Sequence, residues 1–210
     1  MTQPPFPAVF QRFAELLAER FATGIYSTED AVRYTFFLAL LEAGGYEHTD
    51  ISLEEPLVGC KGREVETMVH ANGGRPAAAL EFKYDRVKLA SQNRPQRAGA
   101  ILRDIGRLAQ VHAQESRDVF LVYLTDRGMD SYLTNPRHRL EDVFDQAVGG
   151  QCSLTLDYYH KDRPDSLSKA VQHFGAPCTV SCILRRQLPG DHVLRVFAIE
   201  HVPDPLFRYD

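Results

Sequence analysis

The spacing of hydrophobic residues predicts two helices at the start of the chain. Between Phe10 and Phe21, apolar residues recur every three or four positions and stop before Gly24, which is typical of an amphipathic helix. A second helix is predicted to begin at Ser27, with Asp30 as its capping-box partner, and to end at Gly44-Gly45.

Three strand-like stretches follow these helices. They run from Ile51 to Val58, from Arg63 to His70 and from Pro76 to Tyr84. The sequence Asn72-Gly73-Gly74 separates the last two, and Asn-Gly is a strong signal for a tight hairpin turn. We therefore expect these two strands to lie side by side and antiparallel.

A long amphipathic helix and a buried strand come next. The stretch from Arg94 to His112 has one apolar face, and its other face, which we expect to be exposed, carries Arg97, Arg103, Asp104 and Arg107. The run from Val119 to Leu124 is apolar at every position, which indicates a strand covered on both faces. A strand after a crossover helix returns to the same sheet. The order predicts an α/β protein with a mixed central β-sheet flanked by helices.

The remainder of the chain gives weaker signals. A short helix is predicted after Pro136 up to Ala147, then a strand-like stretch from Ser153 to Tyr159 and a helical patch from Leu167 to Phe174. Two further strands, Thr179–Leu188 and His192–Ile199, are joined by Pro189-Gly190-Asp191 as a terminal hairpin. No linker rich in proline, glycine or serine divides the chain. We expect a single domain over residues 1–210, with a core of about 27–126 and an extension over 127–210.

Composition narrows the class of protein. The 210 residues are 44% hydrophobic and 25% charged, with a formal net charge of −4, so any nucleic-acid-binding surface must be a local concentration of positive charge. The four cysteines form no C-x-x-C pair, which argues against structural zinc and favours reduced thiols. The polar, proline-rich start and the lack of a long apolar run predict a soluble, cytoplasmic protein without a membrane segment.

The candidate chemistry lies on the second and third predicted strands. Glu81 and Lys83 are two positions apart on one strand, so their side chains share a face. Glu66 stands on the preceding strand, with Glu64 on the same face, and the spacing alone does not say which of the two belongs to the site. Mg²⁺ prefers oxygen ligands and is commonly held by one or two carboxylates plus a substrate phosphate.

Glu66 and Glu81 are therefore candidate metal ligands for Mg²⁺ or Mn²⁺, with the backbone carbonyl of Phe82 as a third. Lys83 is a candidate catalytic residue, either as a base if its pKa falls or as a fixed positive charge. Six basic residues after this motif are candidates for binding nucleic-acid phosphates: Arg86, Lys88, Arg94, Arg97, Arg103 and Arg107. The alternative for each set is a solvated charged surface.

This arrangement, over roughly residues 27–126, resembles the PD-(D/E)xK nuclease superfamily, which includes restriction endonucleases. The resemblance implies a restriction-endonuclease-like αβββαβ core with a C-terminal extension. Glu81 and Lys83 match the E-x-K half of the signature and Glu66 stands at the first acid, although that acid is usually aspartate and the Pro-Asp pair is missing. By the same resemblance, Glu29 matches an additional helix carboxylate near the metal, and Gln96 matches a polar residue that some members place near the site.

The resemblance implies a Mg²⁺-dependent nuclease that hydrolyses DNA phosphodiester bonds, in bacterial defence, restriction or repair. RNA stays open as a substrate. A homodimer is expected, because cutting both strands of a duplex needs two sites, and the extension over 127–210 is expected to supply dimer contacts or substrate selection. The alternative function is a catalytically inactive protein of the same fold that binds nucleic acid or acts as a scaffolding subunit. The glutamate at position 66 and the net negative charge favour that alternative.

Overall fold

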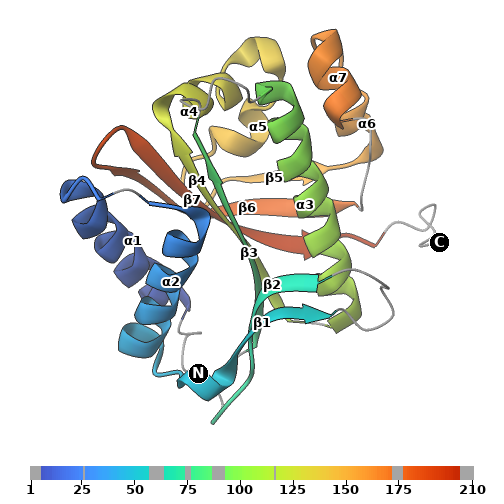
Figure 1. Cartoon of the computed structure of the whole chain (residues 1–210). Coiled ribbons are helices and arrows are strands. Elements are labelled where there is room, and N and C mark those ends of the chain that lie inside the picture. Colours follow the sequence, from blue (N-terminus) through green and yellow to red (C-terminus); the bar gives the residue numbers. More distant parts are fainter. Residues whose placement is uncertain are drawn as a thin grey trace.

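A single mixed β-sheet organises the molecule (Figure 1). The computed structural model describes residues 6–25, 27–56, 64–73, 77–86, 93–115, 117–171 and 177–203. Within them the sheet has seven strands in the order β1-β2-β3-β4-β7-β6-β5. The strands are β1 (Ile51–Pro56), β2 (Glu64–Val69), β3 (Ala78–Asp85), β4 (Asp118–Asp126), β5 (Gln151–Leu154), β6 (Cys178–Leu188) and β7 (His192–His201).

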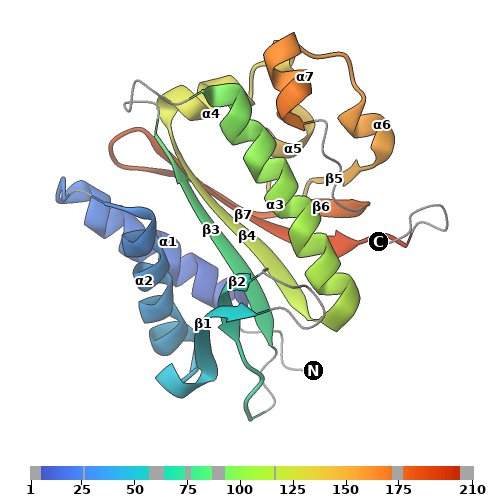
Figure 2. The same ribbon diagram turned by 45° about the vertical axis from the view of Figure 1, so that its right-hand side comes forward.

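Helices cover both faces of this sheet. The longer ones are α1 (Phe6–Ala22), α2 (Glu29–Ala39), α3 (Arg94–Glu115), α4 (Arg127–Leu133) and α7 (Asp165–Val171). The short ones are η1 (Leu40–Gly44), η2 (His48–Asp50), η3 (Pro136–His138), α5 (Glu141–Phe144) and α6 (Leu156–Tyr159). Figure 2 shows α1 and α2 on one side of the sheet and α3 crossing the other side, with α4 to α7 beyond it. No helix in the described ranges is long and apolar enough to cross a membrane.

Strand directions agree with the sequence prediction for the middle of the chain. β1, β2 and β3 pair antiparallel in succession, and β4 returns parallel to β3 after α3. The hairpin β6–β7 is also present, but it is not separate from the sheet: β7 pairs antiparallel with β4 along seven residue pairs, from Phe120–Ala198 to Asp126–His192. The extension therefore continues the same sheet.

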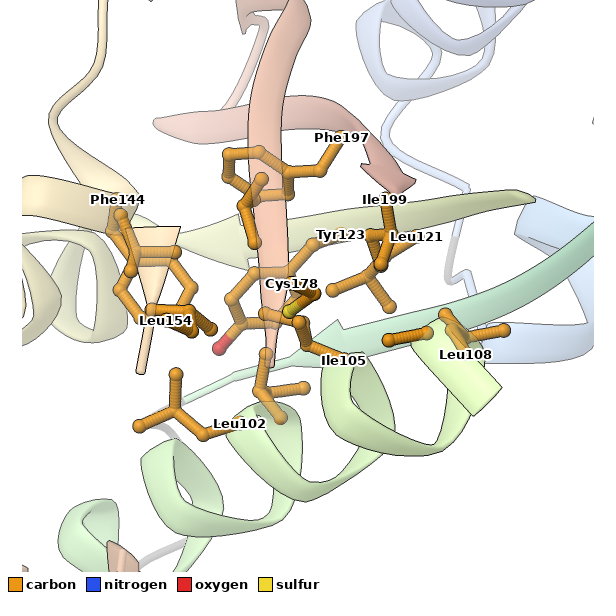
Figure 3. Close-up of a cluster of buried hydrophobic side chains, with 14 of the residues drawn as sticks. Leu102, Ile105, Leu108, Leu121, Tyr123, Phe144, Leu154, Cys178, Phe197 and Ile199 are labelled. Carbon is orange, nitrogen blue, oxygen red and sulfur yellow. The ribbon is translucent and has the colours of Figure 1, made fainter. Parts of the chain in front are cut away.

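Two hydrophobic cores lie on the two faces of the sheet. Alternate residues of β4 supply both, since Leu121 and Tyr123 pack beneath α3 and Val122 and Leu124 pack beneath α1 and α2. Figure 3 shows the core on the α3 side, where Leu102, Ile105 and Leu108 meet β4, β7 and Cys178 of β6. The prediction that 119–124 is a strand covered on both faces is confirmed.

Several local predictions were wrong. The second helix is capped by Thr28, whose hydroxyl accepts from Ala31 N, because the Ser27 hydroxyl instead accepts a hydrogen bond from Arg20 Nε. Helix α4 was not predicted, and it begins directly after β4 because the Asp126 carboxylate caps it by accepting from Met129 N.

The weak signals after residue 136 also differ from the structure. The helix expected up to Ala147 is the turn η3 and the single-turn α5, which ends at Phe144. The stretch from Ser153 to Tyr159 is not one strand, since β5 ends at Leu154 and the rest forms the helical turn α6. Helix α7 ends at Val171, and residues 172–176 of the predicted helical patch lie outside the described residues.

Candidate active site

The candidate site lies where strands β2 and β3 separate. The two strands pair from Val69–Ala78 to Thr67–Leu80, and β3 then continues alone on that side to Asp85. Beyond Leu80, side-chain carboxylates accept hydrogen bonds from the backbone N–H groups on this edge of β3. Phe82 N donates to Glu66 Oε2 at 2.9 Å, and Tyr84 N donates to Glu29 Oε2 at 2.9 Å. Glu66 of β2 and Glu29 of α2 therefore lie at the same edge of β3. We call this place, where β2 and β3 separate, the fork.

Lys83 joins the carboxylates of both strands. Its Nζ lies 2.7 Å from Glu66 Oε1 and 2.8 Å from Glu81 Oε1. The two carboxylate oxygens thus share one cation, the ammonium of Lys83. Glu29 Oε1 lies 3.9 Å from the same Nζ. The structure therefore brings together Glu66, Glu81 and Lys83, which the strand pattern placed near one another, and Glu29, which only the family resemblance had named.

Helix α3 adds two charged residues that the sequence analysis placed on an exposed face. Arg107 Nη2 lies 2.5 Å from Glu81 Oε1 and 3.4 Å from Asp104 Oδ1. Both side chains are partly buried, because this face of α3 covers the strands at the fork. Their separation of three positions indicates that they share a helix face, but it does not tell which way that face points.

Burial and mutual repulsion raise the pKa values of acidic residues in the site. Partial burial raises the pKa of Glu66, and the charge of Glu81 adds to that rise against the opposing effect of Lys83. Burial also raises the pKa of Glu29 and of Asp104. For Lys83, burial lowers the pKa, but Glu81 and Glu66 outweigh it and the net shift is upward. Lys83 is thus an ammonium at neutral pH, which favours its role as a fixed charge over its role as a base.

The donor set fits a divalent cation. Among the described residues, four carboxylates (Glu29, Glu66, Glu81 and Asp104) share the cluster with two cations (Lys83 and Arg107), which leaves two negative charges in excess when all are ionised. Glu81 Oε2 is buried and has no hydrogen-bond partner in the described part of the chain. A buried carboxylate oxygen without a partner is costly unless a ligand satisfies it.

The side chains are not already arranged as a metal-ligand cluster. No group of three or more His, Cys, Asp or Glu residues poised to hold an ion is found within the described ranges. Lys83 Nζ lies between the carboxylates of Glu66 and Glu81, so a metal bound there requires the ammonium to move aside.

A cleft of about 390 Å³ opens beside Lys83, between β3 and α3. Glu29, Asp104, Gln96 and Arg97 are among the residues that line it. Arg97 forms an ion pair with Asp85, and Tyr123 Oη donates to the other oxygen of Asp85 at 2.9 Å. This buried support holds the guanidinium of Arg97 at the edge of the cleft.

The other predicted residues have varied positions. Arg86 stacks over the Tyr84 ring at 4.8 Å, and Arg94 is exposed in the first turn of α3; neither lines the cleft. Lys88 lies outside the described residues.

Glu64 is exposed at the start of β2, so Glu66 is the acid at the site. Phe82 reaches the site through its backbone N–H, while its side chain is buried in the opposite core. Its carbonyl stays a predicted ligand.

No protein-family model, curated protein or solved structure that was compared with the chain matches it. The function therefore has to be argued from the geometry of the site.

Proposed function

We propose that the protein is a metal-dependent nuclease whose reaction takes place at the fork between β2 and β3. The observation that carries the proposal is the convergence of Glu66 and Glu81 on one cation, with a buried oxygen of Glu81 left without a partner. Glu66 and Glu81 would hold Mg²⁺ or Mn²⁺, and Glu29 and Asp104 lie near enough to bind through its water ligands. A divalent ion bound there supplies a Lewis acid for the phosphate and lowers the pKa of a water.

The residues of the chain then have separable tasks. Lys83, protonated and fixed by strand β3, presents positive charge to the developing charge of a phosphodiester. Arg97 lines the same cleft and is held by Asp85, so it is suited to orient a phosphate. Arg107 pairs with an oxygen of Glu81 and with the neighbouring Asp104, so we assign it the task of positioning Glu81.

The order of elements supports the same proposal. Helix α2, strands β1 to β3, helix α3 and strand β4 follow one another as in the αβββαβ core of the PD-(D/E)xK nucleases. The helix before β1 contributes Glu29, and β2 and β3 contribute Glu66 and the Glu81-x-Lys83 pair, as the resemblance in sequence implied.

A cleavage assay with matched variants tests the proposal. Plasmid, linear and single-stranded DNA, and RNA, are incubated with the protein and Mg²⁺ or Mn²⁺. Glu66→Gln, Glu81→Gln and Lys83→Met are each expected to lower cleavage by about 100-fold or more. Glu64→Gln is the matched control, because Glu64 lies on the same strand as Glu66 but is exposed. Cleavage that survives Glu81→Gln, or that falls equally with Glu64→Gln, contradicts the proposal.

A second candidate function is binding without hydrolysis, as a nucleic-acid-binding or scaffolding subunit. The observation that favours it is that Lys83 and Arg107 both already pair with Glu81. Calorimetric titration with Mn²⁺ separates the two candidates. Heat of binding that is lost in Glu66→Gln and Glu81→Gln favours the nuclease, and no binding by the native protein favours the subunit.

For the nuclease, we further propose a homodimer acting on DNA, because two sites are needed to cut a duplex. Light scattering of the purified protein gives the mass that checks this. A mass of one chain at micromolar concentration contradicts it.

A further inference from the structure

We infer that the phosphodiester backbone of the substrate continues from the cleft at Lys83 into a basic groove between α3 and α7, where Arg103 and Lys169 bind its phosphates. This inference rests on the proposed function, because it extends the path of the substrate beyond the reacting site. It assigns a task to α7, which lies outside the 27–126 core.

The groove is a hollow of about 520 Å³ that adjoins the cleft. It is lined by Asn93, Gln96, Arg103, Ser166, Lys169 and Ala170. Asn93 and Gln96 also line the cleft at Lys83, so the two hollows meet at the first turn of α3. Figure 2 shows α7 beside α3, on the side of the sheet that α3 crosses.

The charge of the groove differs from that of the protein as a whole. Its described lining contains two cations and no carboxylate, in a chain whose formal net charge is −4. The cleft next to it is lined by Glu29, Asp85 and Asp104 as well as by Lys83 and Arg97. The cleft thus offers carboxylates for a metal ion, and the groove beside it offers only basic and uncharged residues. This pairing suits a chain of phosphates, since phosphate contacts supply most of the nonspecific affinity for nucleic acid.

The two cations are positioned by close packing of the helices. At Gly99 of α3, a Cβ atom would overlap the carbonyl oxygen of Ala170, so only glycine allows α7 to approach this closely. Arg103, one turn further along α3, donates to the same carbonyl oxygen at 3.3 Å. Lys169 is the next residue before Ala170 and is exposed. Both charges therefore lie at the junction of the two helices and are open to solvent.

Binding measurements test this groove separately from hydrolysis. All proteins carry Lys83→Met, so that the probe is not consumed, and are titrated in Mg²⁺ against fluorescein-labelled DNA and RNA strands of about 20 nucleotides. The double variant Arg103→Gln/Lys169→Gln is compared with Arg12→Gln/Arg186→Gln. The control removes the same charge from the opposite face, where Arg12 pairs with Glu42 and Arg186 lies near Glu15.

The groove variant is expected to bind about tenfold more weakly than its parent, and its affinity to depend less steeply on salt, with a slope smaller by about 2. The control is expected to match the parent. Whether DNA, RNA or both show the loss identifies the source of the phosphates. The inference is overturned if the parent binds neither strand, if the groove variant binds as tightly as the parent, or if poly-glutamate binds while the strands do not.

The two proposals fail in different ways. If the native protein cleaves DNA but the groove variant binds like its parent, the groove is wrong and the nuclease stands. If the groove variant loses binding but the native protein hydrolyses nothing, the nuclease is wrong and the groove stands as a binding site.

Discussion

Lys83 is the residue on which the charges of the site depend. Its ammonium contacts a carboxylate of each strand of the fork, and its side chain is 22% exposed. Without it, Glu66 and Glu81 would lose the cation that joins them, and Glu81 would keep its ion pair with Arg107. Native carboxylates in such a position either take up protons or bind a cation.

The substitution Lys83→Met is expected to lower the free energy of unfolding by about 1–3 kcal/mol near neutral pH, because Glu66 loses its ion pair with Lys83 beside the buried carboxylate of Glu81. The loss should be larger at about pH 8 than at about pH 5, since the repulsion exists only while both acids are ionised. Urea denaturation at the two pH values measures this. An equal loss of stability at the two pH values would mean that Lys83 stabilises the fold by packing and not by its charge.

The raised pKa values of Glu29, Glu66 and Asp104 predict a pH dependence of the metal effect. The pKa of each is higher in the folded protein than its ordinary value of 4.5 or 3.8, so each contributes stability below that value and loses it as pH rises through the folded pKa. A divalent ion binds the ionised form and offsets that loss. Mn²⁺ should therefore raise the melting temperature more at about pH 8 than at about pH 5, as measured by thermal unfolding. An equal shift at both values would contradict this assignment.

Much of the site was predictable from residues on strands, and less from residues on the helix. Alternation along β3 fixes that Glu81 and Lys83 share a face, so that prediction needed no tertiary structure. Glu29 was named only through the family resemblance, since an acid in a first helical turn is ordinary. Arg107 and Asp104 were taken as exposed because a charged helix face next to solvent and one above a polar site have the same pattern.

At the scale of elements, the position of α7 depends on one glycine. The close approach at Gly99 brings Ala170 against the backbone of α3, and the same junction holds Arg103. No pattern in the sequence showed this contact, because glycine within a helix only lowers the intrinsic preference for helix.

The substitution Gly99→Ala separates packing from helix preference. In a free helix alanine would stabilise by up to about 1 kcal/mol relative to glycine. Here we expect a loss of about 1–3 kcal/mol, because the new methyl group meets the Ala170 backbone and α7 must shift. Chemical denaturation measures the sign. A gain in stability would show that α7 does not pack on Gly99.

Element prediction succeeded where hydrophobic periodicity was long and failed in short segments. The helices α1, α2 and α3 and the hairpins β2–β3 and β6–β7 all follow periodic patterns with glycine or asparagine turns. The one-turn helices after β4 bury only a few residues each, so their form is set by the sheet and α3 beneath them. Asp126 is a residue type that commonly caps helices, but it is also the last residue of β4, and α4 begins at the next residue without a loop between them.

At the scale of the whole molecule, the C-terminal strands complete the sheet that holds the site. β7 covers the edge of β4 that the αβββαβ arrangement alone would leave open. Arg195 of β7 joins these parts: it is fully buried, donates to Phe144 O at 2.8 Å and pairs with Asp130 of α4.

The substitution Arg195→Met keeps the volume but removes these bonds. We expect it to lower the free energy of unfolding by about 2–4 kcal/mol, since Asp130 and the Phe144 carbonyl lose their partner. Arg185→Met on β6 is the control, because Arg185 is only partly buried and its pair with Asp145 is 2.9 Å long but half exposed. If both variants lower the free energy of unfolding by the same small amount, Arg195 does not hold β7 to α4 and α5.

We propose that Glu66 and Glu81 hold one divalent cation. The most direct measurement is an anomalous-scattering map from crystals soaked in Mn²⁺. We expect a peak about 2.1 Å from oxygens of both carboxylates, with Lys83 Nζ displaced from between them. A map with no peak at the fork, and with Lys83 still joining the two glutamates, would contradict it.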